Sequence, residues 1–231
     1  MPGYVMHLAE ADMILAEIRR KRNLSEQWAE HFLTGNLLPD TRLLTEKKIS
    51  HFWNPDDLGL IAKAPDLSLF LEKYRPDMDD PVLLGYLTHL HLDARYVHNY
   101  WPRCLAFYNS AGQKETVADQ VTEVEILKTG LRMPPDTFFS PRYYYGDYGR
   151  MNGFFVSRYH IHKPCWKDIT DFHMDEVKLE DMEIISRNMD WLMTHCGREE
   201  ESALKIFDLR EFDSFIHETA KVFMQEYLQE I

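Results

Sequence analysis

The sequence predicts an all-α fold, and three observations support that prediction. Apolar residues recur at helical spacing along most of the chain. Runs in which Val, Ile and Thr alternate with polar residues are scarce, so no sheet is expected. Glycine is sparse, with 10 among 231 residues, and proline falls at local breaks rather than in a linker. Because the chain has no internal repeat either, we expect residues 1–231 to form a single all-α domain.

The first two helices follow from an apolar stripe and a cap. Residues 4–22 carry apolar side chains at helical spacing, among them Leu8 and Ile14, and are expected to form the first helix. Ser25 is a typical N-cap residue and predicts a second helix that continues through Leu33.

Proline marks the boundaries that follow. Pro39 opens an irregular loop that is expected to run to about Pro55, and Pro76 stops a short helix. Asp80 and Pro81 are expected to be the cap and first-turn residue of a long helix. From periodicity, the remaining helices are expected at 67–74, 80–108, 114–129, 143–159, 166–195 and 203–229.

Charge and cysteine content narrow the classes of function. The formal net charge is −12, which disfavours a nucleic-acid partner but permits a small phosphorylated substrate held by metal ions. No apolar run approaches the ~18 residues of a membrane span, and the first residues do not resemble a signal peptide. The three cysteines form neither a disulfide framework nor a CxxC site. We therefore expect a cytoplasmic protein, and the sequence predicts no particular oligomeric state.

The strongest local signal lies in the predicted long helix. His89 and Asp93 are four residues apart, so they share one helical face and could bind a metal ion or simply hydrogen-bond to each other. Apolar neighbours favour a buried site, in which an ionised aspartate needs a strong partner. His91 points about 200° away from His89 and is expected to be exposed or to lie outside the direct ligand set. His98 lies about 180° away and could join the site only if the helix kinks or ends there.

Three further residues could carry chemistry, but each also has an ordinary structural interpretation. Asp40 is presented by the rigid Pro39 turn, where it could equally cap that turn. His51 lies in the same irregular loop, and His7 lies on the first predicted helix. A second pair at helical spacing, His195 and Glu199, is interrupted by a glycine.

The sequence contains no HExxH, His-Asp dipeptide, GxSxG, GxxxxGK[ST] or GxGxxG motif, which excludes the enzyme classes that those motifs identify.

Taken in order, short motifs resemble the zinc-dependent phospholipase C family, in particular its small bacterial members. The resemblance covers roughly residues 1–160 in the same order and comparable spacing, and 161–231 are expected to be a helical C-terminal part. Its motifs are MPGYVMH at the start, LLPD ending at Asp40, SHF around His51, GYLTHLHLD ending at Asp93, and YGDYGRMN around Asp147.

The resemblance implies a phospholipase C or zinc-nuclease-like helical bundle with a zinc site between helices. Carried over, it implies the metal ligands His7, Asp40, His51, His89 and Asp93. It also implies hydrolysis of a phosphoester by metal-activated water, in which Asp40 and Asp93 are the catalytic carboxylates.

The chain departs from the family pattern after the long helix, where a later His and an HxxxE pair have no secure counterpart. One or two ions, zinc or another divalent metal, are therefore expected rather than three. His98 and Asp147 are possible additional site residues, although Asp147 could instead pair with Arg150 on a surface. The alternative function is a helical binding protein whose metal site is degenerate or structural.

Overall fold

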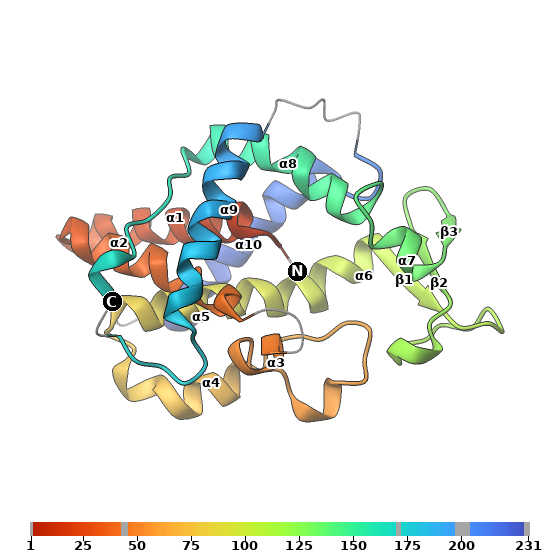
Figure 1. The fold of residues 1–231 in the computed structure, drawn as a ribbon, viewed down its shortest axis with the longest axis horizontal. Helices are drawn as coiled ribbons and strands as arrows, with labels where there is room; N and C mark the ends of the chain where they lie inside the picture. The colour runs from red at the N-terminus through yellow and green to blue at the C-terminus, as the bar shows by residue number, and fades with distance from the viewer. Residues whose placement is uncertain (1, 43–45, 170–171, 197–203, 229–231) are drawn as a thin grey trace.

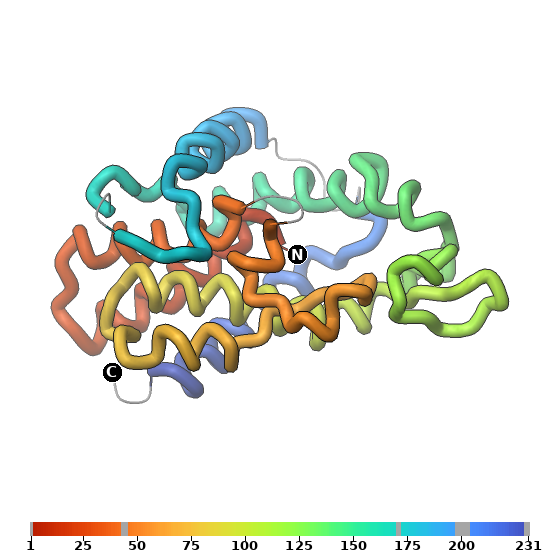
Figure 2. Tube along the Cα trace, turned by 60° about the horizontal axis from the view of Figure 1, so that its bottom comes forward, coloured from red at the N-terminus to blue at the C-terminus, as the bar shows by residue number. Residues whose placement is uncertain are grey.

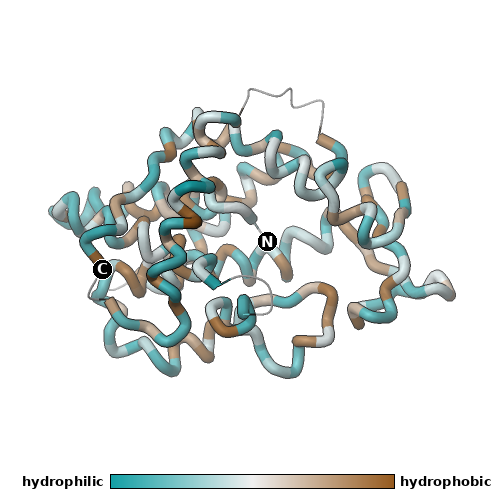
Figure 3. Tube along the Cα trace, in the orientation of Figure 1, coloured by the Kyte–Doolittle hydropathy of each residue, from teal (hydrophilic) through white to brown (hydrophobic). Residues whose placement is uncertain are grey.

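The computed structural model describes residues 2–42, 46–169, 172–196 and 204–228. Most of these residues lie in helices, so the expected mainly helical character is confirmed. No helix within these ranges is long and apolar enough to cross a membrane. Figure 3 shows why, because hydrophilic and hydrophobic residues are mixed along each helix.

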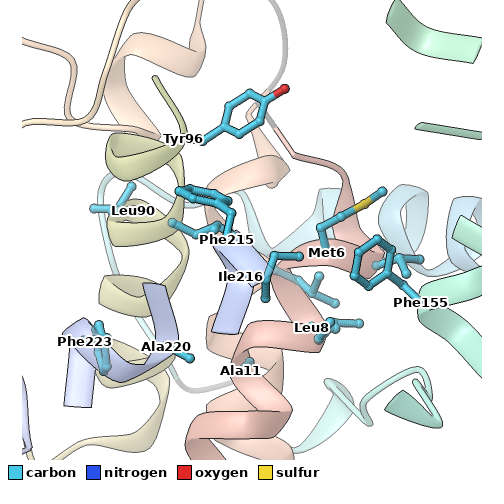
Figure 4. Close-up of a cluster of buried hydrophobic side chains, with 14 of the residues drawn as sticks. Met6, Leu8, Ala11, Leu90, Tyr96, Phe155, Phe215, Ile216, Ala220 and Phe223 are labelled. Carbon is cyan, nitrogen blue, oxygen red and sulfur yellow. The ribbon is translucent and has the colours of Figure 1, made fainter. Parts of the chain in front are cut away.

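Four of the helices surround the central helix α5 (Pro81–Arg95), which is buried along almost its whole length. The other longer helices are α1 (Tyr4–Lys21), α2 (Glu26–Gly35), α4 (Leu67–Tyr74), α8 (Tyr144–Tyr159), α9 (Met182–His195) and α10 (Leu209–Tyr227). Helices α1, α2, α4 and α10 all contact α5, and α8 packs against α1. Figure 4 shows side chains of α1, α5, α8 and α10 meeting in the hydrophobic core, which extends from Val5 to Leu228.

Several helix starts agree with the predicted caps. The Ser25 side chain accepts a hydrogen bond from the Trp28 amide at 3.1 Å, and α2 follows directly. The Asp80 carboxylate accepts from the Val82 amide at 2.7 Å at the start of α5. These bonds satisfy amides that have no partner within the helix, which fixes where each helix begins.

Short elements connect the longer helices. They are the 3-10 turns η1 (Leu38–Thr41), η3 (Pro55–Asp57), η4 (Arg75–Asp77), η6 (Ala118–Gln120), η7 (Lys167–Ile169) and η8 (Leu179–Asp181), the π-turn η5 (Tyr96–Tyr100), and the short helices α3 (Lys47–Ser50), α6 (Trp101–Cys104) and α7 (Pro135–Phe138). The turn η1 and helix α3 lie between α2 and α4 in the sequence and pack against each other.

The region after α5 differs from the predicted helices at 80–108 and 114–129. The α-helix ends at Arg95 and continues as the π-turn η5 and the short helix α6. Pro102 has no amide to donate to the carbonyl four residues earlier, which is consistent with the irregular turn before it. The predicted long helix is therefore too long.

A three-stranded antiparallel sheet then follows, so the expectation of no sheet is wrong. Strands β1 (Leu105–Tyr108), β2 (Glu123–Ile126) and β3 (Leu131–Met133) pair in sequence order. Gly130, with φ of +70°, closes the turn between β2 and β3, a conformation that favours glycine. The sheet lies at one end of the molecule, on the right in Figures 1 and 2.

The C-terminal part is helical over shorter ranges than predicted. In place of a helix at 166–195, the described residues form the turns η7 and η8 followed by α9. In place of a helix at 203–229, they form α10, which begins at Leu209 with an Asp208 cap. Residues 170–171, 203 and 229 lie outside the described ranges.

Candidate metal centre

His89 and Asp93 lie one turn apart on the inner face of α5. The His89 Nε2 atom is 3.5 Å from Asp93 Oδ2, and both side chains are buried. This is the arrangement that their spacing in the sequence predicts. The apolar residues around them on α5 are buried too, so the pair lies inside the protein rather than on a solvated face.

His7 reaches the same carboxylate from the first turns of α1. Its Nε2 atom is 3.4 Å from Asp93 Oδ1, and its ring is fully buried. The ring stacks on that of His89 with centroids 3.7 Å apart. Helices α1 and α5 are in contact, which brings together two residues that are far apart in the sequence.

Asp40 and His51 arrive from the segment between α2 and α4. His51 Nε2 lies 3.5 Å from Asp93 Oδ2 and 3.6 Å from Asp40 Oδ1. Asp40 sits in η1 directly after Pro39. His51 caps α3, and the Tyr86 hydroxyl of α5 donates to the carbonyl of Ser50 just before it. Five side chains from three segments therefore converge, although nothing in the local sequence around Asp40 or His51 alone requires it.

Contacts to the Nδ1 atoms of His89 and His51 orient these two rings. His89 Nδ1 lies 2.8 Å from the backbone carbonyl of Asn36, which can only accept, so Nδ1 carries the proton. The Nε2 atom of His89 is then the ring nitrogen that faces Asp93. A histidine that ligates a metal is typically held in this way by a hydrogen bond from its other nitrogen. Ser50 Oγ lies 3.1 Å from Nδ1 of His51 and could orient that ring similarly.

The distances between the histidine Nε2 atoms and the Asp93 oxygens suit metal ligands better than hydrogen-bond partners. The Nε2 atoms of all three histidines and both oxygens of Asp93 are buried without a hydrogen-bond partner. The separations between the Nε2 atoms and the Asp93 oxygens, 3.4–3.5 Å, are long for hydrogen bonds. Two ligand atoms bonded at about 2.1 Å to one tetrahedral ion lie about 3.4 Å apart. Two groups meet the spacing of a metal site, one of His7, His89 and Asp93 and one of Asp40, His51 and His89.

The protonation states also suit a cation. Burial and the neighbouring His89 lower the pKa of His7 to about 4, and burial and Lys47 lower the pKa of His51 to about 3. Burial alone would raise the pKa of the Asp93 carboxyl, but His7 and His89 hold it well below its usual range. At neutral pH, His7 and His51 are therefore neutral ligands and Asp93 is a buried carboxylate.

The charges of these residues do not balance without a further cation. Burial would raise the pKa of Asp40, yet Lys47 and the imidazoles lower it, so Asp40 is ionised as well. Two carboxylates then share one ammonium, that of Lys47, which lies 2.7 Å from Asp40 Oδ1. Buried charges are normally paired or bound to metal. Imidazole nitrogen and carboxylate oxygen are suitable ligands for zinc and for several other divalent ions. The residues present therefore fit a divalent metal ion.

Two other residues that the sequence suggested for the site lie elsewhere. His98 is exposed in η5, beyond the end of α5. Asp147 is fully buried in α8, where its carboxylate accepts hydrogen bonds from the backbone amides of Lys205, Ile206 and Phe207 at 2.7–3.2 Å. The Arg150 guanidinium also lies 3.4 Å from Asp147 Oδ1, so the expected pair forms, although Asp147 is buried rather than on a surface. All of these donors are unrelated to the five converging residues. Glu199 lies outside the described residues.

His91 is buried, which corrects one of the two positions expected for it. It lies on a different face of α5 from His89, with Nδ1 3.7 Å from Glu10 Oε1 and Nε2 3.8 Å from Glu226 Oε2. Its ring packs edge-on against Phe223 of α10. His91 therefore belongs to the contact between α1, α5 and α10.

Sequence reasoning did not single out Lys47, the cation beside Asp40. Lysine is common on helix surfaces, and only the folded segment shows that this one faces the site. Comparison with family models, curated proteins and solved structures finds no match for this chain.

Proposed function

We propose that this chain is a metal-dependent hydrolase of a phosphoester, in keeping with the resemblance to zinc-dependent phospholipase C. The observation that carries the proposal is the convergence of three unpaired imidazole Nε2 atoms on the two unpaired oxygens of a buried aspartate. Zinc is the expected metal because it prefers nitrogen and oxygen ligands of this kind. The small phosphorylated substrate and the cytoplasmic location stay predictions from the sequence.

One or two ions could be held by these residues. His89 belongs to both groups that could form a site, but it has a single nitrogen to offer because Nδ1 bonds the Asn36 carbonyl. The residues that would hold two ions are His7, His89 and Asp93 on one side and Asp40 and His51 on the other. One ion would use His89 and Asp93 together with His7.

In hydrolysis, the two aspartates would play different parts. A divalent ion bound here would lower the pKa of a water ligand and neutralise charge on the phosphoryl oxygens. Asp93 is fully buried and is suited to ligation alone, whereas Asp40 lies nearer solvent and could accept a proton from the attacking water. As the bond from water oxygen to phosphorus forms and the ester P–O bond breaks, that proton would pass to the leaving alkoxide.

The alternative is a helical binding protein in which the same residues hold a structural metal. The observation that favours it is burial, since every one of the five side chains is shielded from solvent. Structural zinc sites are filled by protein ligands, whereas catalytic sites keep a position open for water or substrate. Bound metal without turnover would support this alternative.

Metal analysis of the purified protein, followed by assays on phosphate monoesters and diesters, tests the proposal. We expect at least one equivalent of divalent metal and hydrolysis that stops when a chelator removes it. His89→Ala and Asp93→Ala should each lower metal content and activity, whereas His98→Ala, which alters an exposed histidine near the end of the same helix, should change neither. Full metal content in both His89→Ala and Asp93→Ala would contradict the proposal.

A further inference from the structure

Lys47 lies where the candidate metal centre is least buried. It is the first residue of α3, and its ammonium is 2.7 Å from Asp40 Oδ1. The Lys47 side chain is 27% exposed and that of Asp40 is 9% exposed, whereas those of His51 and Asp93 are fully buried. A ligand that enters from solvent would therefore meet Lys47 and Asp40 first.

The electrostatic role of Lys47 would change if a metal ion were bound. Without an ion, its ammonium is the counter-charge of Asp40. A divalent ion would balance both Asp40 and Asp93, so the ammonium would then have no carboxylate of its own to neutralise. Lysine is a compact charge on a flexible stem, and it can turn from one oxygen to another a few ångströms away.

We infer that Lys47 is a positioning residue that binds the anionic phosphoryl group of the substrate beside the metal centre. The inference rests on the proposed function and names the chemical class that the site selects, a phosphate monoester or free phosphate with two negative charges. A phosphate oxygen accepts a strong, charge-assisted hydrogen bond from an ammonium. The same contact would hold the phosphorus next to Asp40, the carboxylate that can reach the attacking water.

The experiment measures binding of inorganic phosphate to the metal-loaded full chain by isothermal titration calorimetry. Lys47→Gln removes the charge and keeps a polar side chain. Lys48→Gln is the matched control, because Lys48 is the next residue of the same helix, carries the same charge and is exposed. We expect phosphate to bind Lys47→Gln about 10-fold to 100-fold more weakly than the wild type, as for a lost charged hydrogen bond. Lys48→Gln should bind as the wild type does, and Lys47→Arg should recover part of the loss.

Metal content is measured on the same samples so that a structural role is recognised. Loss of metal from Lys47→Gln would show that the residue holds the site together and would overturn the inference. Equal phosphate affinity in the wild type and Lys47→Gln would overturn it too, as would a metal-loaded wild type that binds no phosphate.

Turnover separates this inference from the proposed function. With a phosphate monoester that is hydrolysed, Lys47→Gln should raise KM more than it lowers kcat, and a phosphodiester with one charge should be less affected. If no phosphoester is hydrolysed but phosphate binds through Lys47, the catalytic proposal fails and the inference stands.

Discussion

The buried carboxylates of this chain differ in what compensates their charge. Asp147 accepts from three backbone amides, Asp40 pairs with Lys47, and Asp93 faces three imidazoles. Glu10 has no such hydrogen-bond partner, because both of its carboxylate oxygens are buried without one. Since burial without compensation disfavours the charged form, these residues should respond differently to substitution and to pH.

Asp147→Asn should destabilise the protein without removing metal. The carboxylate accepts from the amides of Lys205, Ile206 and Phe207, and an asparagine NH2 group would confront some of those donors. Leaving a buried donor unsatisfied costs about 1–3 kcal/mol. Urea unfolding and metal analysis of the variant measure the two effects separately. A loss of metal affinity with unchanged stability would instead support the role in the metal site that the sequence suggested for Asp147.

Glu10→Gln should stabilise the protein, and increasingly so as the pH rises. Burial raises the pKa of Glu10 well above its usual value. The unfolded chain therefore releases this proton at a lower pH than the folded one, so wild-type stability falls as the pH rises above the unfolded pKa. His91 gives no compensating charge, because burial lowers its pKa to about 3. The advantage of the variant can grow by up to about 1.4 kcal/mol per pH unit in this range.

Unfolding measured at pH 5, 7 and 9 checks this prediction. The difference between variant and wild type isolates Glu10, since every other titrating group is present in both. Glu17→Gln on the same helix is the control, because it makes the same change at a side chain that is 37% exposed rather than buried. A constant difference for Glu10→Gln would mean that Glu10 is ionised in the folded protein.

At the scale of residues, the sequence could predict pairs that share one element but not partners from different elements. The spacing of His89 and Asp93 is enough to place them on one face of a helix. Asp40 and His51 could be assigned to the same site only through the family resemblance. The amides that bind Asp147 lie 58 to 60 residues further along the chain, and no local sequence pattern around Asp147 predicts them.

At the scale of elements, two glycines set the distance between α2 and α5. A Cβ atom on Gly85 would lie 2.0 Å from the backbone carbonyl oxygen of Phe32, and one on Gly35 would lie 2.1 Å from that of Val82. The helices can therefore pack with their backbones in contact. This close approach also brings the Asn36 carbonyl within 2.8 Å of His89 Nδ1. The packing of α2 against α5 thus orients a candidate ligand.

Gly85→Ala should destabilise the protein and weaken metal binding. The atoms that a methyl group would strike belong to the backbone, so relief requires the two helices to move apart. We expect a loss of about 1–3 kcal/mol, towards the upper end. Because the hydrogen bond between His89 and the Asn36 carbonyl would lengthen, metal affinity should fall about 10-fold or more. Unfolding in urea and a competition titration with a zinc indicator measure these changes.

Gly149→Ala is the matched control for this substitution. Gly149 also lies within a helix, but nothing is within 4 Å of the place where its Cβ would be. An alanine there should stabilise α8 by about 0.5–1 kcal/mol and leave metal affinity unchanged. If both substitutions had the same effect, the contact between α2 and α5 would not be the cause.

Elements with a cap and a proline boundary could be predicted closely, whereas the sheet could not. Helix α4 spans the predicted residues, and α5 begins at the predicted Pro81. The strands are only three or four residues long, too short for a clear alternating pattern. A weak signal exists in β2, where Val124 and Ile126 are buried between glutamates and a turn with Gly130 follows. Sequence reasoning passed over it because the flanking charged residues fit a helix equally well.

At the scale of the whole molecule, the candidate metal centre lies where three parts of the chain meet. His7 belongs to α1, His89 and Asp93 to α5, and Asp40 and His51 to the segment between α2 and α4. The sheet at the far end contributes none of the five residues. A bound ion would therefore stabilise one side of the molecule in particular, and its removal would leave Asp40 and Asp93 to repel each other.

Metal removal should accordingly loosen the molecule locally rather than throughout. In hydrogen exchange followed by mass spectrometry, a chelator should speed exchange of peptides that cover 36–42, 46–53 and the first turns of α1. At a free metal concentration 100 times the Kd, the ion would contribute about 2.7 kcal/mol, so exchange by local opening should accelerate about 100-fold when it is removed. Peptides from β1 to β3 should exchange at the same rate in both states and serve as the internal control. Equal acceleration in the sheet would indicate global unfolding instead, and no change at 36–42 and 46–53 would mean that Asp40 and His51 do not hold the ion.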